Sequence, residues 1–211
     1  MTSENFTRRA FITTAAGGAA ALISGCGMTA PVSRARGGPV NIGFGLWTGV
    51  PGVTFGDRVD NVEGIRRISG PRTWTHPVTG RPMTVYVRTK QEDAGPKIGY
   101  YTLRADGSAL SRVYDSRPDR SDRFFLDDAL MPQGIWQGGV TKTYSMTAYA
   151  EGKATKYNVS IRVTKPSFSY KGRAGSMEYI WSQTTMGGRE VRKLRYTYSP
   201  GIGFVDIDNL M

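Results

Sequence analysis

The chain has 211 residues and a formal net charge of +11, and 39% of its residues are hydrophobic. This is enough apolar material for one ordinary domain. Residues 1–25 carry two arginines and one glutamate, so the rest of the chain is near +10, and a basic surface suggests anionic neighbours such as lipid headgroups or acidic glycans. Cys26 is the only cysteine, which excludes an internal disulfide and any CxxC metal or redox site.

Residues 1–25 have the three parts of a signal peptide in the right order. Arg8 and Arg9 form a basic start, a mild stretch rich in alanine and glycine follows, and small residues precede Cys26. This ending resembles the lipobox of bacterial lipoproteins, in which the peptidase cuts before the cysteine and its thiol receives a diacylglycerol. Two or three acyl chains, palmitate among them, would anchor the protein stably where one would not.

Arg8, Arg9 and Phe11 resemble the twin-arginine (Tat) export pattern S/T-R-R-x-F-L-K, in which Ile12 here replaces the leucine and Thr13 the lysine. An ordinary Sec signal is the alternative. Gly27 follows the cysteine, so the aspartate that retains lipoproteins at the inner membrane of enteric bacteria is absent. We therefore expect a lipid anchor in the cell membrane that faces the periplasm or the exterior. In a host with two membranes, the outer membrane is favoured.

Three segments follow from this pattern: a signal peptide at 1–25, a lipidated cysteine with a flexible tether at 26–39, and a single β domain at 40–211. The tether has no apolar period and contains Gly, Pro and Arg.

Apolar and polar residues alternate along much of the β domain, as in strands with one buried face. In the clearest segment Tyr157, Val159, Ile161 and Val163 share one face. Strands are predicted around residues 83–89, 97–104, 109–114, 141–150, 157–163, 177–182, 191–198 and 203–207, with turns at 77–80, 105–108, 151–153, 186–188 and 199–201. Residues 127–133 suit one helical turn at most. The pattern predicts an all-β fold whose antiparallel sheet curls into a barrel, a half-barrel or a sandwich.

The C-terminal motif at residues 196–205, Y-T-Y-S-P-G-I-G-F-V, resembles the closing hairpin of a family of bacterial envelope β proteins of unknown function. The preceding residues 163–170, V-T-K-P-S-F-S-Y, are also similar, although K-P-S-F stands where that family has V-P-A-G-T-F. The resemblance covers about the last 70 residues and implies an antiparallel sheet wrapped into a barrel-like shell. It implies no catalytic residue.

Chemistry-bearing motifs are scarce, so we predict no catalytic residue, no metal site and no cofactor. His76 is the only histidine, and its place between Thr75 and Pro77 predicts a surface residue in a turn. Two carboxylates alone can serve a glycosidase. The candidate pairs are Asp127 with Asp128, Glu92 with Asp93, Asp57 with Asp60, and Asp206 with Asp208.

Two functional hypotheses remain. The first is a non-enzymatic, membrane-anchored envelope lipoprotein that binds a hydrophobic ligand, a cell-wall component or a protein partner. Its partners would be the membrane through the lipid anchor and an anionic lipid or cell-wall polymer, but not nucleic acid. The alternative is a carboxylate-dependent hydrolase of cell-wall glycans.

Overall fold

A computed structural model of the chain describes residues 40–42, 54–55, 66–199 and 203–211, all within one compact unit, Ala35–Met211. The signal residues Arg8, Arg9 and Phe11, the lipidation site Cys26 and the tether at 26–39 lie outside the described residues. Within the described part no helix is long and apolar enough to cross a membrane.

The described residues form fourteen strands and no helix, which confirms the all-β prediction. The first half of the chain holds β1 (Val40–Ile42), β2 (Thr54–Phe55), β3 (Arg66–Thr75), β4 (Pro82–Glu92), β5 (Gly95–Leu103), β6 (Ala109–Arg117) and β7 (Arg120–Leu126). The second half holds β8 (Met131–Pro132), β9 (Gly134–Trp136), β10 (Thr141–Ala150), β11 (Lys153–Tyr170), β12 (Arg173–Thr185), β13 (Glu190–Ser199) and β14 (Gly203–Asn209).

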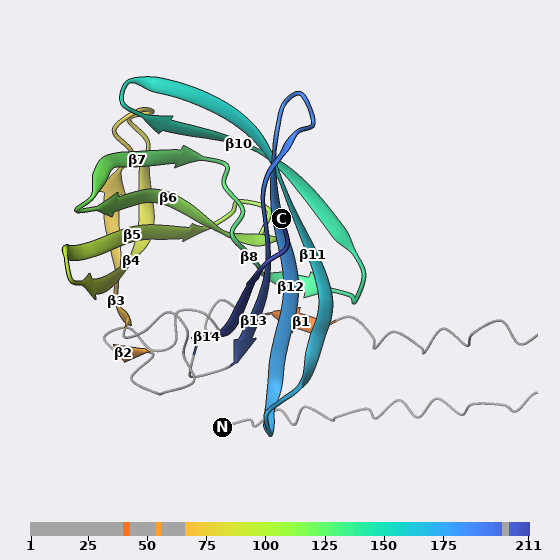
Figure 1. Cartoon of the computed structure of the whole chain (residues 1–211). Coiled ribbons are helices and arrows are strands. Elements are labelled where there is room, and N and C mark those ends of the chain that lie inside the picture. Colours follow the sequence, from red (N-terminus) through yellow and green to blue (C-terminus); the bar gives the residue numbers. More distant parts are fainter. Residues whose placement is uncertain (1–39, 43–53, 56–65, 200–202) are drawn as a thin grey trace, which may run out of the picture. The chain divides into compact units, whose positions relative to one another are not determined.

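One antiparallel sheet contains twelve of these strands, in the order β14-β13-β12-β11-β10-β7-β6-β5-β4-β3-β2, with β8 paired to β6 and with β1 and β9 forming a separate pair. Among the described residues the end strands β2 and β14 do not pair with each other, so the sheet is curled but open. Figure 1 shows β5–β7 running roughly horizontally and β11–β14 running roughly vertically, with β10 bending between them. The two halves of the sheet therefore enclose a concave space.

The predicted hairpin forms between β10 and β11. Tyr144 lies opposite Val159, and Met146 lies opposite Tyr157. Glu151 and Gly152 form the turn at φ angles of 50° and 72°, the left-handed conformation that a two-residue hairpin turn requires. Because the turn fixes the register, the apolar residues of both strands face the concave space together.

The hydrophobic core lies on this concave side and joins the two halves of the sheet. Val159, Ile161 and Val163 are fully buried there beside residues of β5–β7. From β12, the Trp181 indole N–H donates to the carbonyl of Ala129 at 2.8 Å. The predicted helical turn at 127–133 is wrong, because Asp127 adopts a φ of 57° and the chain enters β8 four residues later. This irregular segment is what β12 packs against.

A second cluster, partly buried, lies on the opposite face of β3–β7. Val87 is paired with Tyr100, and Tyr100 with Tyr114, so their side chains share the face that Arg88 does not. The Tyr100 ring centroid lies 4.8 Å from that of Tyr114 and 5.3 Å from that of Trp74. The expectation of one wet face for each strand is therefore wrong here, since β4 buries Val87 on this face and points Arg88 to the other.

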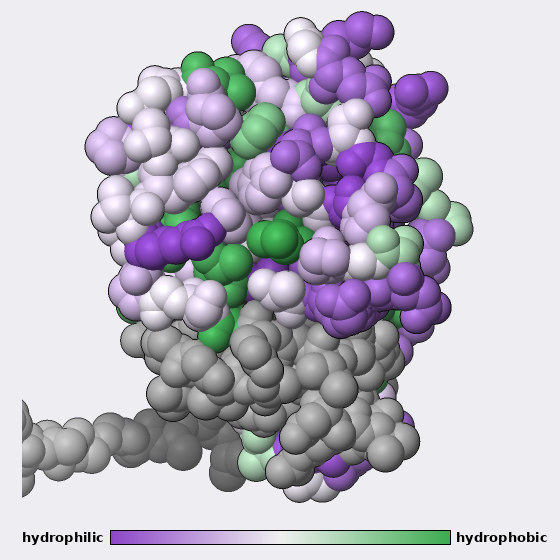
Figure 2. Space-filling model, turned by 90° about the vertical axis from the view of Figure 1, so that its left-hand side faces the viewer, coloured by the Kyte–Doolittle hydropathy of each residue, from purple (hydrophilic) through white to green (hydrophobic). Residues whose placement is uncertain are grey.

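Figure 2 shows the side of the molecule that lies to the left in Figure 1. Strongly hydrophilic residues gather toward one side of this face, and the hydrophobic residues between them form only small groups. The coloured part of this face therefore presents no broad apolar patch of the kind that a large protein interface requires.

The position of the core predicts that truncating two different isoleucines changes the free energy of unfolding by different amounts. Ile161→Ala removes a fully buried side chain and should lower the free energy of unfolding by about 2–5 kcal/mol. The same change at Ile135, which is 69% exposed on β9, should change it by no more than about 0.5 kcal/mol. Urea denaturation of both variants measures this, and equal losses would contradict the described core.

Candidate functional site

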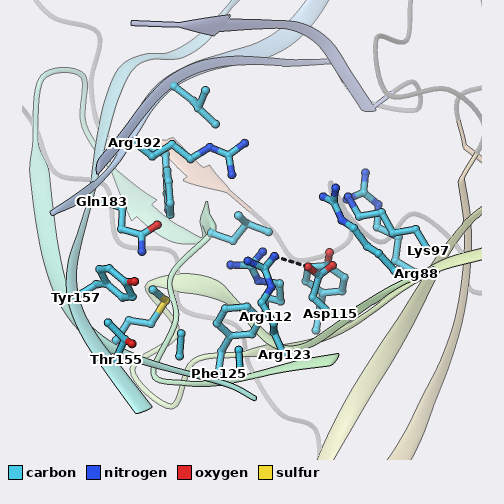
Figure 3. Close-up of a pocket in the computed structure, with 18 of the residues that line it drawn as sticks. Arg88, Lys97, Arg112, Asp115, Arg123, Phe125, Thr155, Tyr157, Gln183 and Arg192 are labelled. Carbon is cyan, nitrogen blue, oxygen red and sulfur yellow. Dashed lines mark hydrogen bonds and ion pairs between the residues drawn. The ribbon is translucent and has the colours of Figure 1, made fainter. Parts of the chain in front are cut away.

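A cavity of about 510 Å³ lies in the concave space of the sheet, between β4–β7 and β10–β14. Its floor is the hydrophobic core, since Phe125, Met146 and Trp181 belong to both. Figure 3 shows Arg88 and Lys97 on one side of the cavity, Arg112, Asp115 and Arg123 at its base, and Gln183 across it. The volume falls within the range of roughly 300–1,000 Å³ that small-molecule sites occupy.

Positive charge dominates the lining of the cavity. Seven cationic side chains line it, against two carboxylates, Asp115 and Glu151. The cations come from six strands: Arg88 on β4, Lys97 on β5, Arg112 and Arg117 on β6, Arg123 on β7, Lys153 on β11 and Arg192 on β13. A cleft lined by one sign of charge focuses its field and attracts ions of the opposite sign.

Asp115 holds two of the surrounding arginines in place. Its Oδ2 accepts hydrogen bonds from Arg123 at 2.7 Å and from Arg120 at 2.5 Å. Burial opposes ionisation of this carboxyl, but the Arg123 hydrogen bond and the nearby charges of Arg112 and Lys97 outweigh burial and lower its pKa. Asp115 is therefore an ionised carboxylate that is already engaged in ion pairs.

Arg112 is held by Asp128, which lies outside the cavity lining, and by Phe125 on the cavity floor. Its Nε lies 3.2 Å from Oδ2 of Asp128, and its guanidinium lies 3.9 Å from the centroid of the Phe125 ring. Asp128 is fully buried, and burial raises its pKa although Arg112 beside it opposes the shift. The pair fixes the direction of the Arg112 guanidinium, and the Phe125 ring sets its plane.

Lys97 and Arg117 are different, because neither forms an ion pair with any residue in the described part of the chain. Burial, together with the positive charges of Arg117 and Arg88, lowers the pKa of Lys97 to about 8. The negative charges of Asp115 and Glu92 raise the pKa of Lys97, but by less than the other effects lower it. Two like charges are thus held close together in a partly buried place, which is unfavourable unless an anion joins them.

A small residue in β5 shapes this part of the cavity. A Cβ atom at Gly99 would lie 2.6–2.9 Å from ring atoms of Tyr101, so only glycine lets that ring lie flat over the strand. Tyr101 lines the cavity next to Lys97. Gly99 also lies opposite Asp115 in the β5–β6 register, which places the carboxylate and the tyrosine around the same point.

The residues predicted as candidates from the sequence lie elsewhere. His76 is fully buried rather than on the surface: its Nδ1 accepts the Val78 N–H at 3.3 Å, so its Nε2–H donates to the Phe125 carbonyl at 3.2 Å. Burial lowers the pKa of His76 despite that backbone hydrogen bond. His76 is a structural residue that ties the turn after β3 to β7.

Among the described residues, the predicted carboxylate pairs do not come together in the cavity. Asp128 is buried behind Arg112, and Asp208 on β14 forms an ion pair with Arg195. None of the candidates in the described residues, namely Glu92, Asp93, Asp127, Asp128, Asp206 and Asp208, lines the cavity, and Asp57 and Asp60 lie outside the described residues. No group of three or more metal-ligating side chains occurs within the described ranges.

Comparison with known proteins adds no relative: no protein-family model, no curated protein and no solved structure matches this chain. The functional assignment therefore depends on the chemistry of the cavity alone.

Sequence reasoning missed the cationic cavity, although one signal was present. The strands carry basic residues at positions where the alternation of polar and apolar residues predicts a solvent-facing side chain, among them Arg88, Lys97 and Arg123. Only the presence of a second apolar face on the same strands, with Val87 and Tyr100, indicates that both faces are enclosed.

Proposed function

We propose that this protein is a non-enzymatic, membrane-anchored envelope lipoprotein whose β domain binds an anionic ligand in the cavity. The single observation that carries the proposal is the lining of seven cationic side chains against two carboxylates. Of the partners expected from the sequence, namely a hydrophobic ligand, a cell-wall component, an anionic lipid or a protein, the cavity lining favours one that carries negative charge. Within the described residues, none of the predicted carboxylate pairs lines the cavity, so the lining favours anion binding over carboxylate-dependent hydrolysis.

The energetics of charge burial in the cavity support this proposal. Burying a cation costs free energy unless a partner of opposite charge or a hydrogen-bond acceptor joins it. Asp115 and Asp128 supply such partners for Arg123 and Arg112. A phosphate, sulfate or carboxylate group would do the same for Lys97 and Arg117, with charge-assisted hydrogen bonds.

Lys97→Met with Arg117→Met should weaken binding of an inorganic anion by about tenfold or more, because each lost hydrogen bond to a charged group contributes roughly 1.5–3 kcal/mol. Isothermal titration calorimetry with sulfate or pyrophosphate measures the affinity. The full chain carrying Cys26→Ser serves as the parent protein, because it needs no detergent. Lys156→Met is the matched control, since Lys156 is an exposed lysine on β11 outside the cavity lining.

The free energy of unfolding of the double variant distinguishes a structural role of Lys97 and Arg117 from a ligand-binding role. If they serve the fold, their loss lowers the free energy of unfolding. If they serve a ligand, the ligand-free double variant is at least as stable as its parent, because like-charge repulsion is removed. A destabilised variant with unchanged anion affinity would overturn the proposal.

The affinity for sulfate should fall as the pH rises through about 8. Lys97, whose pKa is lowered to about 8, is charged and attracts the anion below that pH, and it loses its charge above it. Sulfate keeps its own charge over this range, so the protein causes the change. Titration calorimetry between pH 6.5 and pH 9.5 should show the fall in the parent, and Lys97→Met should flatten it; an equal fall in both would assign the effect to another group.

The proposed anchor has a separate test. Cys26→Ser removes the acylated thiol and should move the protein from the membrane fraction to the soluble fraction, with loss of labelling by radioactive palmitate. Ser24→Thr, a change of one small residue near the same site, is the control and should stay in the membrane fraction. Retention of the serine variant on the membrane would contradict lipid anchoring at Cys26.

A further inference from the structure

The two walls of the cavity differ in chemistry. The wall formed by β4–β7 carries Arg88, Lys97, Arg112, Arg117 and Arg123, and we call it the cationic wall. The wall formed by the neighbouring strands β12–β14 carries Trp181, Leu194, Tyr196, Phe204 and Ile207, and we call it the apolar wall. The adjoining strand β11 lines the cavity with Lys153, Thr155 and Tyr157 and is not part of this wall. Only Arg192 brings a charge to β13 among the lining residues of the apolar wall.

Aromatic packing joins the strands of the apolar wall. The Tyr196 ring stacks on Tyr179 at a centroid distance of 5.1 Å and lies 5.0 Å from the Phe204 ring. Ile207 is paired with Tyr196 in the β13–β14 register. Apolar surface therefore extends from the buried Phe204 on the floor to Ile207, which lines the cavity and is 37% exposed.

An inorganic anion would leave this wall unused. A small anion contacts the cationic wall alone, whereas a cavity of about 510 Å³ also has room for the apolar part of a ligand. The apolar surface at Leu194, Tyr196, Phe204 and Ile207 spans two neighbouring strands, which lie about 5 Å apart. That width suits one extended hydrocarbon chain rather than a pair of chains.

We infer that the ligand is a single-chain anionic amphiphile, with a phosphate or sulfate head on the cationic wall at Lys97 and Arg117 and a hydrocarbon chain along the apolar wall toward Ile207. This inference rests on the proposed function, because it specifies the ligand of the same cavity. A site at a membrane surface meets such molecules as lipid phosphates and lysophospholipids. The chain passes Ile207 where the wall reaches solvent, so the cavity need not enclose its full length.

Three probes separate the two parts of the ligand. Dodecyl phosphate has head and chain, inorganic phosphate has the head alone, and dodecyl maltoside has the same chain with a neutral head. We expect dodecyl phosphate to bind the full chain carrying Cys26→Ser at least about tenfold more tightly than either of the others, because only it contacts both walls. Titration calorimetry below the micelle concentration of each amphiphile measures the three affinities.

Variants on each wall assign the contacts. Ile207→Ser should lower the affinity for dodecyl phosphate several-fold and leave the affinity for inorganic phosphate unchanged. Lys97→Met should lower the affinity for both. Ile135→Ser, at an exposed isoleucine outside the cavity lining, is the control and should change neither. Leu194→Ser, deeper on the apolar wall, provides a second variant, and its unfolding curve shows whether the fold is kept.

Each outcome has a distinct meaning. Equal affinities for dodecyl phosphate and inorganic phosphate would overturn the amphiphile and leave the anion-binding function standing. Equal affinities for dodecyl phosphate and dodecyl maltoside would overturn both, because the cations would then add nothing. Absence of binding by all three probes would also overturn both.

Discussion

The packing of β12 against the irregular segment after β7 is the interaction on which the rest of the structure depends. Trp181 donates its indole N–H to Ala129 at 2.8 Å, and the Tyr179 hydroxyl donates to Leu130 at 3.3 Å. These bonds satisfy two backbone carbonyls of the irregular segment between β7 and β8. They hold the two halves of one sheet close enough for a common core, and they leave the space above that core as the cavity.

The cations in the cavity fall into two groups, those with a carboxylate partner and those without one. Arg112 and Arg123 have carboxylate partners in Asp128 and Asp115, so their positions are fixed before any ligand arrives. Lys97 and Arg117 have no ion-pair partner among the described residues, and the lowered pKa of Lys97 reports the cost of that arrangement. Fixed cations beside unpaired ones form a preorganised site, to which the proposed anionic ligand would supply the missing negative charge.

Local sequence rules succeeded where structure depends on near neighbours. The β10–β11 hairpin follows from two-residue alternation on either side of Glu151 and Gly152, and the two strands pair around that turn. The same rules failed for His76, because its burial depends on Phe125, a residue 49 positions away. They failed for residues 127–133 as well, because contacts with β12 override the weak preference of that segment for a helical turn.

The sequence by itself determined the all-β class and most of the turns, because alternation and glycine-containing turns act over a few residues. It also supports the anchor at Cys26, which is a prediction that depends on linear order alone. Only the tertiary structure decided where the charges meet. Arg88, Lys97 and Arg123 resemble solvent-facing residues until the sheet folds back on itself, and the side of each strand that becomes enclosed is set by long-range packing. The cationic cavity exists for that physical reason.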